Sequence, residues 1–195
     1  MKSWNILIAG VGGQGTLLAS RVLGALAQAA GCDIKVSEVH GMAQRGGSVV
    51  TYVKMADTVH TPIIEAGEAD VLLAFEQLEA LRYAPSVRPG GAILLNIQRI
   101  LPMPVIMGKQ PYPQDVVATL NARDAHVQAI DALALAQRAG NTKAVNTVML
   151  GLLSRSMDYD EALWLDAIAR SVPAKLLDVN LKAFKEGRRE SDGVE

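Results

Sequence analysis

Short apolar runs separated by polar or glycine-rich segments dominate the first two-thirds of the chain. Several of these runs are rich in β-branched residues and bounded by turn-forming residues, as buried strands are. Segments with apolar positions at helical spacing alternate with them. We therefore predict strands at 4–9, 33–39, 48–55, 69–75, 91–96 and 125–131, and helices at 13–30, 76–83 and 114–122.

Two proline-containing segments interrupt this alternation. Residues 85–91 (PSVRPGG) predict a turn. Residues 97–113 contain four prolines and predict a loop around one short strand, PVIM at 104–107.

From about residue 131 the pattern is helical. We predict helices at 132–140, 144–157, 160–172 and 174–187, followed by a polar, frayed tail at 188–195. Strands that alternate with helices favour an α/β fold. The expected architecture is Rossmann-like: a mostly parallel open sheet with helices on both faces and a helical C-terminal part at about 131–187. Because 195 residues suit one hydrophobic core, we expect a single domain over 1–195.

Composition and charge argue against several classes of function. The formal net charge is −1, which gives no basic field for nucleic acid. No apolar stretch approaches the length of a membrane span, and the first residues lack a secretory pattern. Cys32 is the only cysteine, so the chain cannot build an iron–sulfur or zinc site by itself. We expect a cytoplasmic protein whose redox chemistry, if any, uses a borrowed cofactor or another chain.

The stretch ILIAGVGGQGTL at 6–17 carries the first candidate site. Gly10, Gly12 and Gly15 match the G-x-G-x-x-G pattern between a predicted strand and a predicted helix. Such glycines allow a tight turn, close approach of a pyrophosphate, and helix packing, and the helix N-terminus attracts anions. Thr16 adds a hydroxyl, and no lysine follows as in a P-loop.

This pattern leaves two interpretations open. Glu38 lies 23 residues after Gly15, near the place where dinucleotide-binding proteins keep an acid for a ribose hydroxyl, so NAD is one candidate ligand. A tight turn that binds nothing is the other. The NAD hypothesis is weakened because none of His40, His60 and His126 lies in an acid–base motif; His40 is the most interesting by position.

A second loop follows Glu38. In HGMAQRGGSV at 40–49, glycines surround Arg45, whose guanidinium suits a phosphate or carboxylate. In an open α/β sheet this loop would lie near the glycine loop, where ligands bind. A surface turn with a solvated arginine is the alternative.

Three motifs together resemble a known family. They are GVGGQG at 10–15, SEVHGMAQRGGSV at 37–49 and KAVNTVMLGLL at 143–153. Over roughly residues 4 to 187 the chain resembles the gamma-type domain of 2-oxoacid (pyruvate/ketoisovalerate):ferredoxin oxidoreductases, and within it the small (beta) subunit type of the indolepyruvate enzymes.

The resemblance implies a concrete activity. Such enzymes oxidatively decarboxylate a 2-oxoacid, form an acyl-CoA and reduce ferredoxin. A large (alpha) subunit would carry thiamine diphosphate and iron–sulfur clusters, so this chain would work in a hetero-oligomer and be inactive alone. Its cleft would help bind coenzyme A and close the thiamine diphosphate site. The implied cleft residues are Gly10, Gly12, Gly13, Gln14, Gly15, Thr16, Glu38, Arg45, Gly46, Gly47 and Ser48.

Two other hypotheses stay open: a stand-alone NAD-binding oxidoreductase or regulatory module, and a non-catalytic assembly subunit. In the third motif, Asn146 interrupts an apolar helix, where asparagine is a poor interior residue. We expect its side chain to hydrogen-bond a neighbouring loop or subunit. Gly151 in the same helix would let another helix approach closely.

Overall fold

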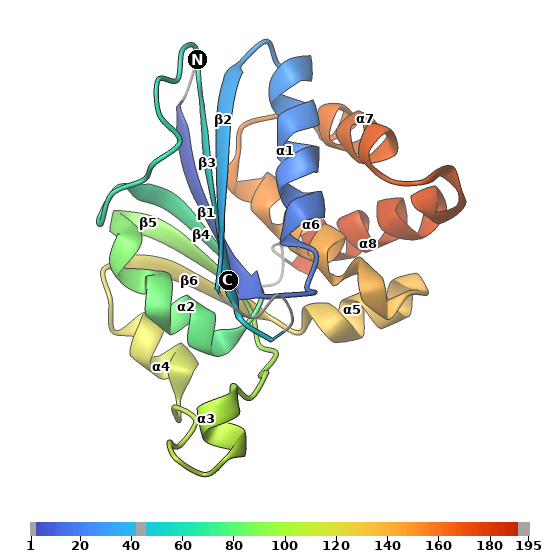
Figure 1. Ribbon diagram of the computed structural model, residues 1–195. Helices are drawn as coiled ribbons and strands as arrows, with labels where there is room; N and C mark the ends of the chain where they lie inside the picture. The colour runs from blue at the N-terminus through green and yellow to red at the C-terminus, as the bar shows by residue number, and fades with distance from the viewer. Residues whose placement is uncertain (1–2, 42–45, 191–195) are drawn as a thin grey trace.

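A six-stranded sheet between two layers of helices forms the body of the protein in the computed structural model, which describes residues 3–41 and 46–190 (Figure 1). The strand order is β2-β3-β1-β4-β5-β6. The strands are β1 (Trp4–Val11), β2 (Asp33–His40), β3 (Ser48–Ala56), β4 (Ala69–Ala74), β5 (Val87–Asn96) and β6 (Ala125–Ile130).

Most strands run in the same direction. β1, β4, β5 and β6 are parallel neighbours, whereas β3 runs antiparallel to both β1 and β2. The β2–β3 pair is therefore a hairpin that inserts β3 between β1 and the edge strand β2. The predicted fold class, a mostly parallel α/β sheet, is confirmed.

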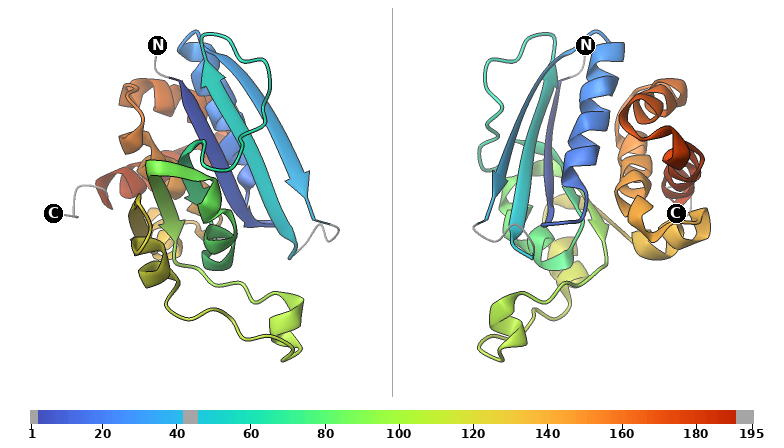
Figure 2. Two further views of the ribbon diagram at one scale, coloured as in Figure 1. Left: turned by 90° about the vertical axis from the view of Figure 1, so that its left-hand side faces the viewer. Right: turned by 45° about the vertical axis from the view of Figure 1, so that its right-hand side comes forward.

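Helices cover both faces of the sheet, as predicted (Figure 2). Alternate residues of the central strands point to opposite faces, so Ile6 and Ile8 belong to one hydrophobic cluster and Leu7 and Ala9 to the other. The larger cluster packs under α1 (Thr16–Ala29), α5 (Ala132–Ala139), α6 (Val145–Ser156), α7 (Glu161–Ser171) and α8 (Leu177–Glu190). The smaller one packs under α2 (Gln77–Tyr83) and α4 (Val116–Asn121).

The predicted strand at 104–107 is wrong. The segment forms a short helix, α3 (Met103–Ile106), in which the Ile106 N–H donates to the Pro102 carbonyl at 3.1 Å. Pro104 fits because it lies in the first helical turn, where a missing N–H costs nothing. Closely spaced prolines indicate extended backbone, but proline is equally compatible with the first turn of a helix.

Three element ends also differ from the prediction. Most of the predicted turn at 85–91 belongs to β5, which begins at Val87. The first helix begins at Thr16 rather than at residue 13, because Gly13 and Gly15 have φ of 104° and 85°. The tail predicted to fray from residue 188 is helical through Glu190, and Arg188 pairs with Glu161 at 3.2 Å. Residues 191–195 lie outside the described part.

Across residues 3–41 and 46–190, no helix has the length and apolarity needed to cross a membrane.

Candidate functional site

The glycine loop turns the chain from the carboxyl end of β1 into α1. The Gln14 N–H donates to the Val11 carbonyl at 3.1 Å and closes the turn. Gly13 and Gly15 both take the left-handed conformation, which an L side chain rarely adopts. The local sequence therefore forces a sharp turn and starts the helix at Thr16, directly beside the end of the sheet.

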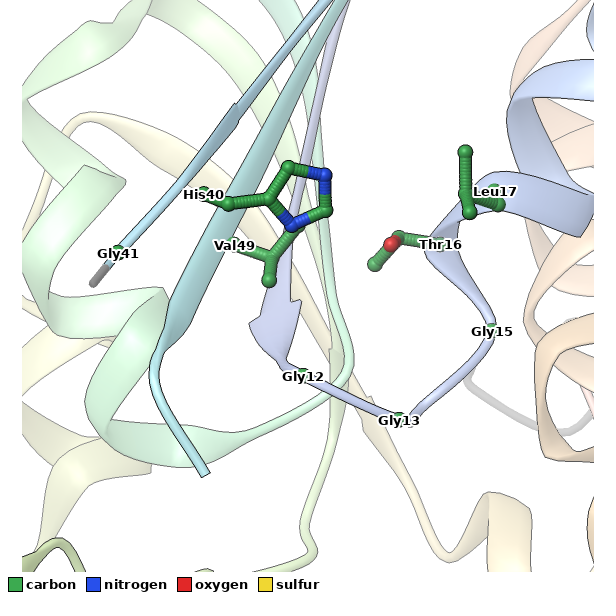
Figure 3. Close-up of a pocket in the computed structure, with 8 residues that line it drawn as sticks. All are labelled: Gly12, Gly13, Gly15, Thr16, Leu17, His40, Gly41 and Val49. Carbon is green, nitrogen blue, oxygen red and sulfur yellow. The ribbon is translucent and has the colours of Figure 1, made fainter. Parts of the chain in front are cut away.

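A cleft of about 580 Å³ opens between this loop and the ends of β2 and β3. Figure 3 shows the first turn of α1 on one side and the β2–β3 hairpin on the other. The cleft is lined by Gly12, Gly13, Gly15, Thr16, Leu17, His40, Gly41 and Val49. Four of these residues, Gly12, Gly13, Gly15 and Thr16, belong to the set implied by the family resemblance.

The cleft combines polar donors with an apolar wall. The first N–H groups of α1 have no partner within their own helix and carry the positive end of its dipole, which favours anions. The Thr16 side chain points across the cleft toward Val49 and His40 (Figure 3). Leu17 and Val49 supply apolar surface, and Leu17 is half exposed. The site suits a ligand with both a phosphate and an apolar part.

Glu38 lies beside the cleft and holds His40. Its Oε1 is 2.5 Å from Nε2 of His40, and its Oε2 accepts a hydrogen bond from the Thr51 hydroxyl at 2.9 Å. The two residues are two positions apart on β2, so their side chains share a face of the sheet. The Glu38 carboxylate therefore bonds to protein groups, while the His40 ring faces the cleft.

Gln14 fixes the glycine loop to the crevice between β1 and β4. Its Oε1 accepts from the Val11 N–H at 2.7 Å, and its Nε2 donates to the Phe75 carbonyl at 3.0 Å and to Oε1 of Gln98 at 3.3 Å. In doubly wound folds, this crevice between neighbouring parallel strands is where ligands bind. Here the Gln14 side chain fixes the glycine loop to residues that follow β4 and β5. A second cleft of about 420 Å³ opens on this side, lined in part by Gly13, Gln14, Gly15, Gln98 and Asn146. Gly10 is packed beneath Gln14, where a Cβ would lie 3.0 Å from its Oε1.

The second loop lies beside the first, as predicted, because the Gly12 N–H donates to the Gly47 carbonyl at 2.9 Å. Gly46 precedes this contact and takes a positive φ of 78°. Ser48 faces away from the cleft, since its hydroxyl donates to Glu79 at 2.5 Å on the α2 face of the sheet. Arg45 lies outside the described residues.

Asn146 at the start of α6 supports the glycine loop from behind. Its Nδ2 lies 3.4 Å from the Gly15 carbonyl oxygen, which confirms the predicted bond to a neighbouring loop. Its Oδ1 accepts from the Thr147 N–H at 2.8 Å, and the Thr147 hydroxyl bonds Asn180 of α8 at 2.6 Å. A chain of buried polar groups thus connects the glycine loop to the C-terminal helices.

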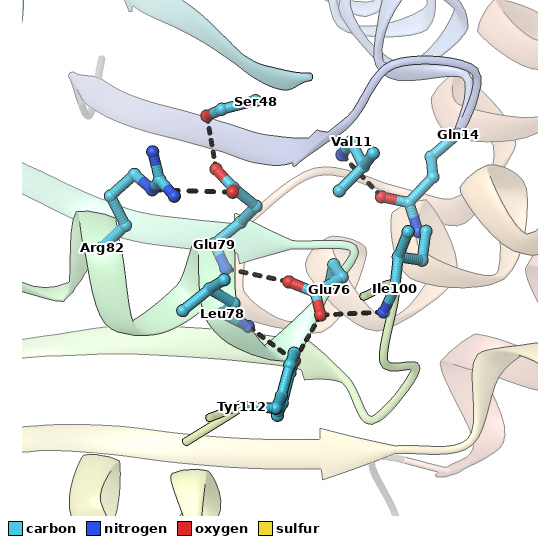
Figure 4. Close-up of polar contacts among 9 residues, drawn as sticks. All are labelled: Val11, Gln14, Ser48, Glu76, Leu78, Glu79, Arg82, Ile100 and Tyr112. Carbon is cyan, nitrogen blue, oxygen red and sulfur yellow. Dashed lines mark hydrogen bonds and ion pairs between the residues drawn. The ribbon is translucent and has the colours of Figure 1, made fainter. Parts of the chain in front are cut away.

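A buried acidic network lies at the carboxyl end of β4 (Figure 4). Glu76 is 1% exposed and accepts hydrogen bonds from the Glu79 N–H at 3.0 Å, the Ile100 N–H at 3.1 Å and the Tyr112 hydroxyl. These bonds replace the water that the carboxylate loses on burial. Since Glu79 also bonds Ser48, the network connects the β2–β3 hairpin, α2 and the segment after β5.

Glu79 is a group in this network whose ionisation changes stability. Its burial raises the pKa above the ordinary value of 4.5, and nearby Glu76 raises it further, whereas the Ser48 hydroxyl and Arg82 oppose the shift. A carboxyl with a raised pKa binds its proton more tightly in the folded state. It therefore stabilises the fold at low pH, and this contribution is lost as the pH rises through the folded-state pKa.

We predict that Glu79→Gln flattens this pH dependence. The amide cannot ionise, but its oxygen still accepts the Ser48 hydrogen bond. Between pH 4.5 and pH 7, the unfolding free energy of the variant should fall less with rising pH than that of the wild type, as measured by urea unfolding. Glu65→Gln, at an exposed position, is the control and should reproduce the wild-type curve. Parallel curves for wild type and Glu79→Gln would contradict the assignment.

Sequence reasoning missed several residues of the site. Leu17, Gly41 and Val49 line the cleft and lie within the quoted stretches 6–17 and 37–49, but they are not among the implied cleft residues, and neither is His40. The alternation of β2 places His40 on the face of Glu38, which is a signal that could have identified it. Glu76 and Glu79 are absent from the site residues predicted from the sequence. Over residues 3–41 and 46–190, no group of three or more metal-ligating side chains lies close enough together to hold a metal ion.

The fold and the cleft define a Rossmann-like α/β domain with a glycine loop between β1 and α1. Residues 5–190 match the family described as pyruvate ferredoxin/flavodoxin oxidoreductase, and the chain belongs to this family. Indolepyruvate oxidoreductase subunit IorB from Thermococcus kodakarensis is 42% identical over 192 residues, which span 96% of this chain and 95% of the relative. The subunit of the same name from Methanothermobacter thermautotrophicus is 38% identical, over 95% and 96% of the two chains.

Solved structures agree on the fold. The gamma subunit of a keto/oxoacid ferredoxin oxidoreductase from Geobacter sulfurreducens superposes with a TM-score of 0.74 at 23% identity, over 98% of this chain and 99% of that one. A 2-oxoglutarate:ferredoxin oxidoreductase from Magnetococcus marinus, solved with 2-oxoglutarate, coenzyme A and succinyl-CoA, gives a TM-score of 0.75 at 19% identity. This chain covers only 32% of that longer chain. By family and length, the protein is a small subunit of a 2-oxoacid:ferredoxin oxidoreductase.

Proposed function

We propose that the chain is the small subunit of an indolepyruvate-type enzyme and that its glycine-loop cleft binds part of coenzyme A. In this proposal a large subunit holds thiamine diphosphate and iron–sulfur clusters and passes electrons to ferredoxin in the cytoplasm. The substrate is an aryl 2-oxoacid, which is oxidatively decarboxylated to an acyl-CoA and carbon dioxide. The observation that carries the proposal is the cleft beside the N-terminus of α1, together with near full-length relatives that are indolepyruvate oxidoreductase subunits.

The cleft matches the chemistry of coenzyme A. The ligand has anionic phosphates, an aromatic base and a long, largely neutral arm that ends in a thiol. The N–H groups of the first turn of α1 suit a phosphate, and Thr16 adds a hydroxyl. Leu17 and Val49 offer apolar surface to the base or to the arm. No side chain lining the described cleft is acidic, and the neighbouring Glu38 carboxylate is bonded to His40 and Thr51.

In the reaction, this chain positions groups rather than reacting itself. Thiamine diphosphate, when bound by the large subunit, supplies the carbanion chemistry of decarboxylation. The glycine loop orients coenzyme A so that its thiol reaches the acyl group from one direction. The loop and the hairpin also exclude water from that side and so protect the acyl group from hydrolysis. Because Gln14 bonds three protein groups, the loop is fixed before the ligand arrives.

The geometry favours coenzyme A over NAD. In a dinucleotide-binding sheet, the ribose-binding acid ends the strand beside β1. Here β3 separates β2 from β1, and the Glu38 carboxylate is bonded to Thr51 and His40. The third hypothesis, an assembly subunit without a ligand, predicts that changes in the cleft leave turnover unchanged.

We predict that Leu17→Glu weakens coenzyme A binding. The new carboxylate would lie at the cleft mouth and repel the phosphates that the helix N-terminus attracts. In the assembled complex, the KM for coenzyme A should rise at least about tenfold, which is 1.4 kcal/mol. The KM for the 2-oxoacid should change little.

Leu17→Gln is the matched control, because it has the size and polarity of the glutamate variant without its charge. It should raise the KM for coenzyme A much less than Leu17→Glu does. Equal coenzyme A kinetics for both variants and the wild type would contradict binding at this cleft and favour the assembly hypothesis. Tight binding of NAD at the cleft without binding of coenzyme A would favour the dinucleotide hypothesis.

A further inference from the structure

Residues 97–113, which we call the apolar arm, leave the carboxyl end of β5 and project away from the body of the protein (Figures 1 and 2). The arm carries α3 near its tip. Met103, Ile106 and Met107 are 63%, 62% and 58% exposed, and no residue of α3 is buried. Large apolar side chains gathered on a protruding element mark an interaction site.

The tip of the arm has a defined conformation although no residue of α3 is buried. The Met107 N–H donates to the Met103 carbonyl and the Gly108 N–H to the Val105 carbonyl, both at 2.9 Å. Gly108 takes a positive φ of 68°, and the Lys109 N–H returns to the Pro104 carbonyl at 2.8 Å. This is a capped helical turn, so the exposed side chains are held in a fixed array.

The base of the arm is fixed to the core. Glu76 accepts hydrogen bonds from the Ile100 N–H at one end of the arm and from the Tyr112 hydroxyl at the other. The Gln77 N–H also donates to the Gln98 carbonyl at 3.1 Å. Three prolines, at 102, 104 and 111, stiffen the segment between these anchors. The arm therefore loses little conformational entropy on binding.

The arm also adjoins the candidate cleft. It begins at the carboxyl end of β5, the edge of the sheet at which β1 ends in the glycine loop. Nε2 of Gln14 in that loop lies 3.3 Å from Oε1 of Gln98 at the base of the arm. A chain that covers the cleft would meet the arm as well.

We infer that the apolar arm is the element that docks this chain onto the large subunit, with Met103, Ile106 and Met107 inserted in an apolar groove. This inference rests on the proposed function for the identity of the partner. Arg99 and Lys109 are the charged residues of the arm, and both are positive. The groove should therefore have an acidic rim.

Size requires a partner that covers more of this chain than the tip. The tip exposes an apolar area on the order of 300 Å², as functional patches on monomers do. A stable interface buries about 800 Å² on each partner. The tip alone cannot hold a dimer together, so its partner must also cover neighbouring surface, and the adjoining cleft is the surface that the large subunit would close.

The experiment uses the full chain co-expressed with a tagged large subunit. The test variant combines Met103→Ser, Ile106→Ser and Met107→Ser. The control combines Val36→Ser and Ile63→Ser, which are also exposed apolar positions but lie outside the arm. We expect the arm variant to lose at least about nine-tenths of the co-purified small subunit, which is tenfold in affinity. The control should co-purify like wild type, and all three chains should have the same Tm alone.

A second measurement detects the contact directly and does not depend on a loss of binding. A photo-reactive phenylalanine analogue at position 106 should cross-link to the large subunit, and the same analogue at position 63 should not. An arm variant that assembles normally, or a cross-link to a second copy of this chain, would overturn the inference. If the wild-type chain itself does not bind the large subunit, the proposed function fails rather than the assignment of the arm.

Discussion

Gly151→Ala should destabilise the fold by about 3 kcal/mol or more, although alanine is the better helix former. Gly151 lies on the face of α6 that packs against α8. A Cβ there would lie 2.0 Å from the Phe184 carbonyl oxygen and 2.9 Å from the Arg188 nitrogen, both backbone atoms. On α8, a Cβ at Gly187 would lie 1.9 Å from the Val148 carbonyl oxygen. The two helices touch backbone to backbone, so they must separate to admit a methyl group.

Urea unfolding followed by circular dichroism measures this cost. Gly24→Ala in α1 is the matched control, because a Cβ at Gly24 meets no atom within 4 Å. There the helical preference of alanine acts alone, and stability should rise by up to about 1 kcal/mol. If both alanine variants changed stability in the same direction, the close α6–α8 contact would be refuted.

Gly15→Ala should damage the candidate cleft more than any other single methyl group in the glycine loop. The residue has φ of 85°, and a Cβ would lie 2.4 Å from Nδ2 of Asn146. The left-handed backbone costs roughly 1–2 kcal/mol for alanine. The methyl group also forces Asn146 away from the Gly15 carbonyl. We expect a loss of about 2 kcal/mol in stability and, in the assembled complex, a KM for coenzyme A raised at least about tenfold.

Two further variants separate the effect of backbone strain from the effect of displacing Asn146. Gly13→Ala has the same kind of backbone strain, with φ of 104°, but open space around its Cβ. It should cost stability without displacing Asn146. In the double variant Gly15→Ala with Asn146→Ala, the space is restored, so the combined loss should be smaller than the sum of the single losses. Strict additivity would mean that the contact between these two residues does not matter.

The sheet and most helices could be predicted because local sequence and tertiary packing agree. The buried strands are apolar on both faces, and the C-terminal helices carry apolar stripes that the fold uses. The α3 segment could not be predicted, because its prolines permit both an extended chain and a first helical turn. The insertion of β3 beside β1 depends on pairing between distant strands, which no local pattern encodes.

Only the part of the candidate site that carries a sequence motif could be predicted. The glycines predict the turn and the start of the helix. Asn146 was expected to contact a loop, and it contacts the Gly15 carbonyl. The role of Gln14 in fixing the glycine loop could not be predicted, because its partners Phe75 and Gln98 come from distant parts of the chain. Ser48, implied by resemblance as a cleft residue, instead bonds Glu79 on the other face.

The central claim is that this chain works as the small subunit of a larger enzyme. The most direct measurement is a gentle native purification from the source cell, followed by mass spectrometry of the co-eluting chains and assays for iron and thiamine diphosphate. The account predicts a large partner that carries both, in a complex that oxidises 2-oxoacids only when coenzyme A is present. A chain that elutes alone, without iron, and binds NAD tightly would contradict it.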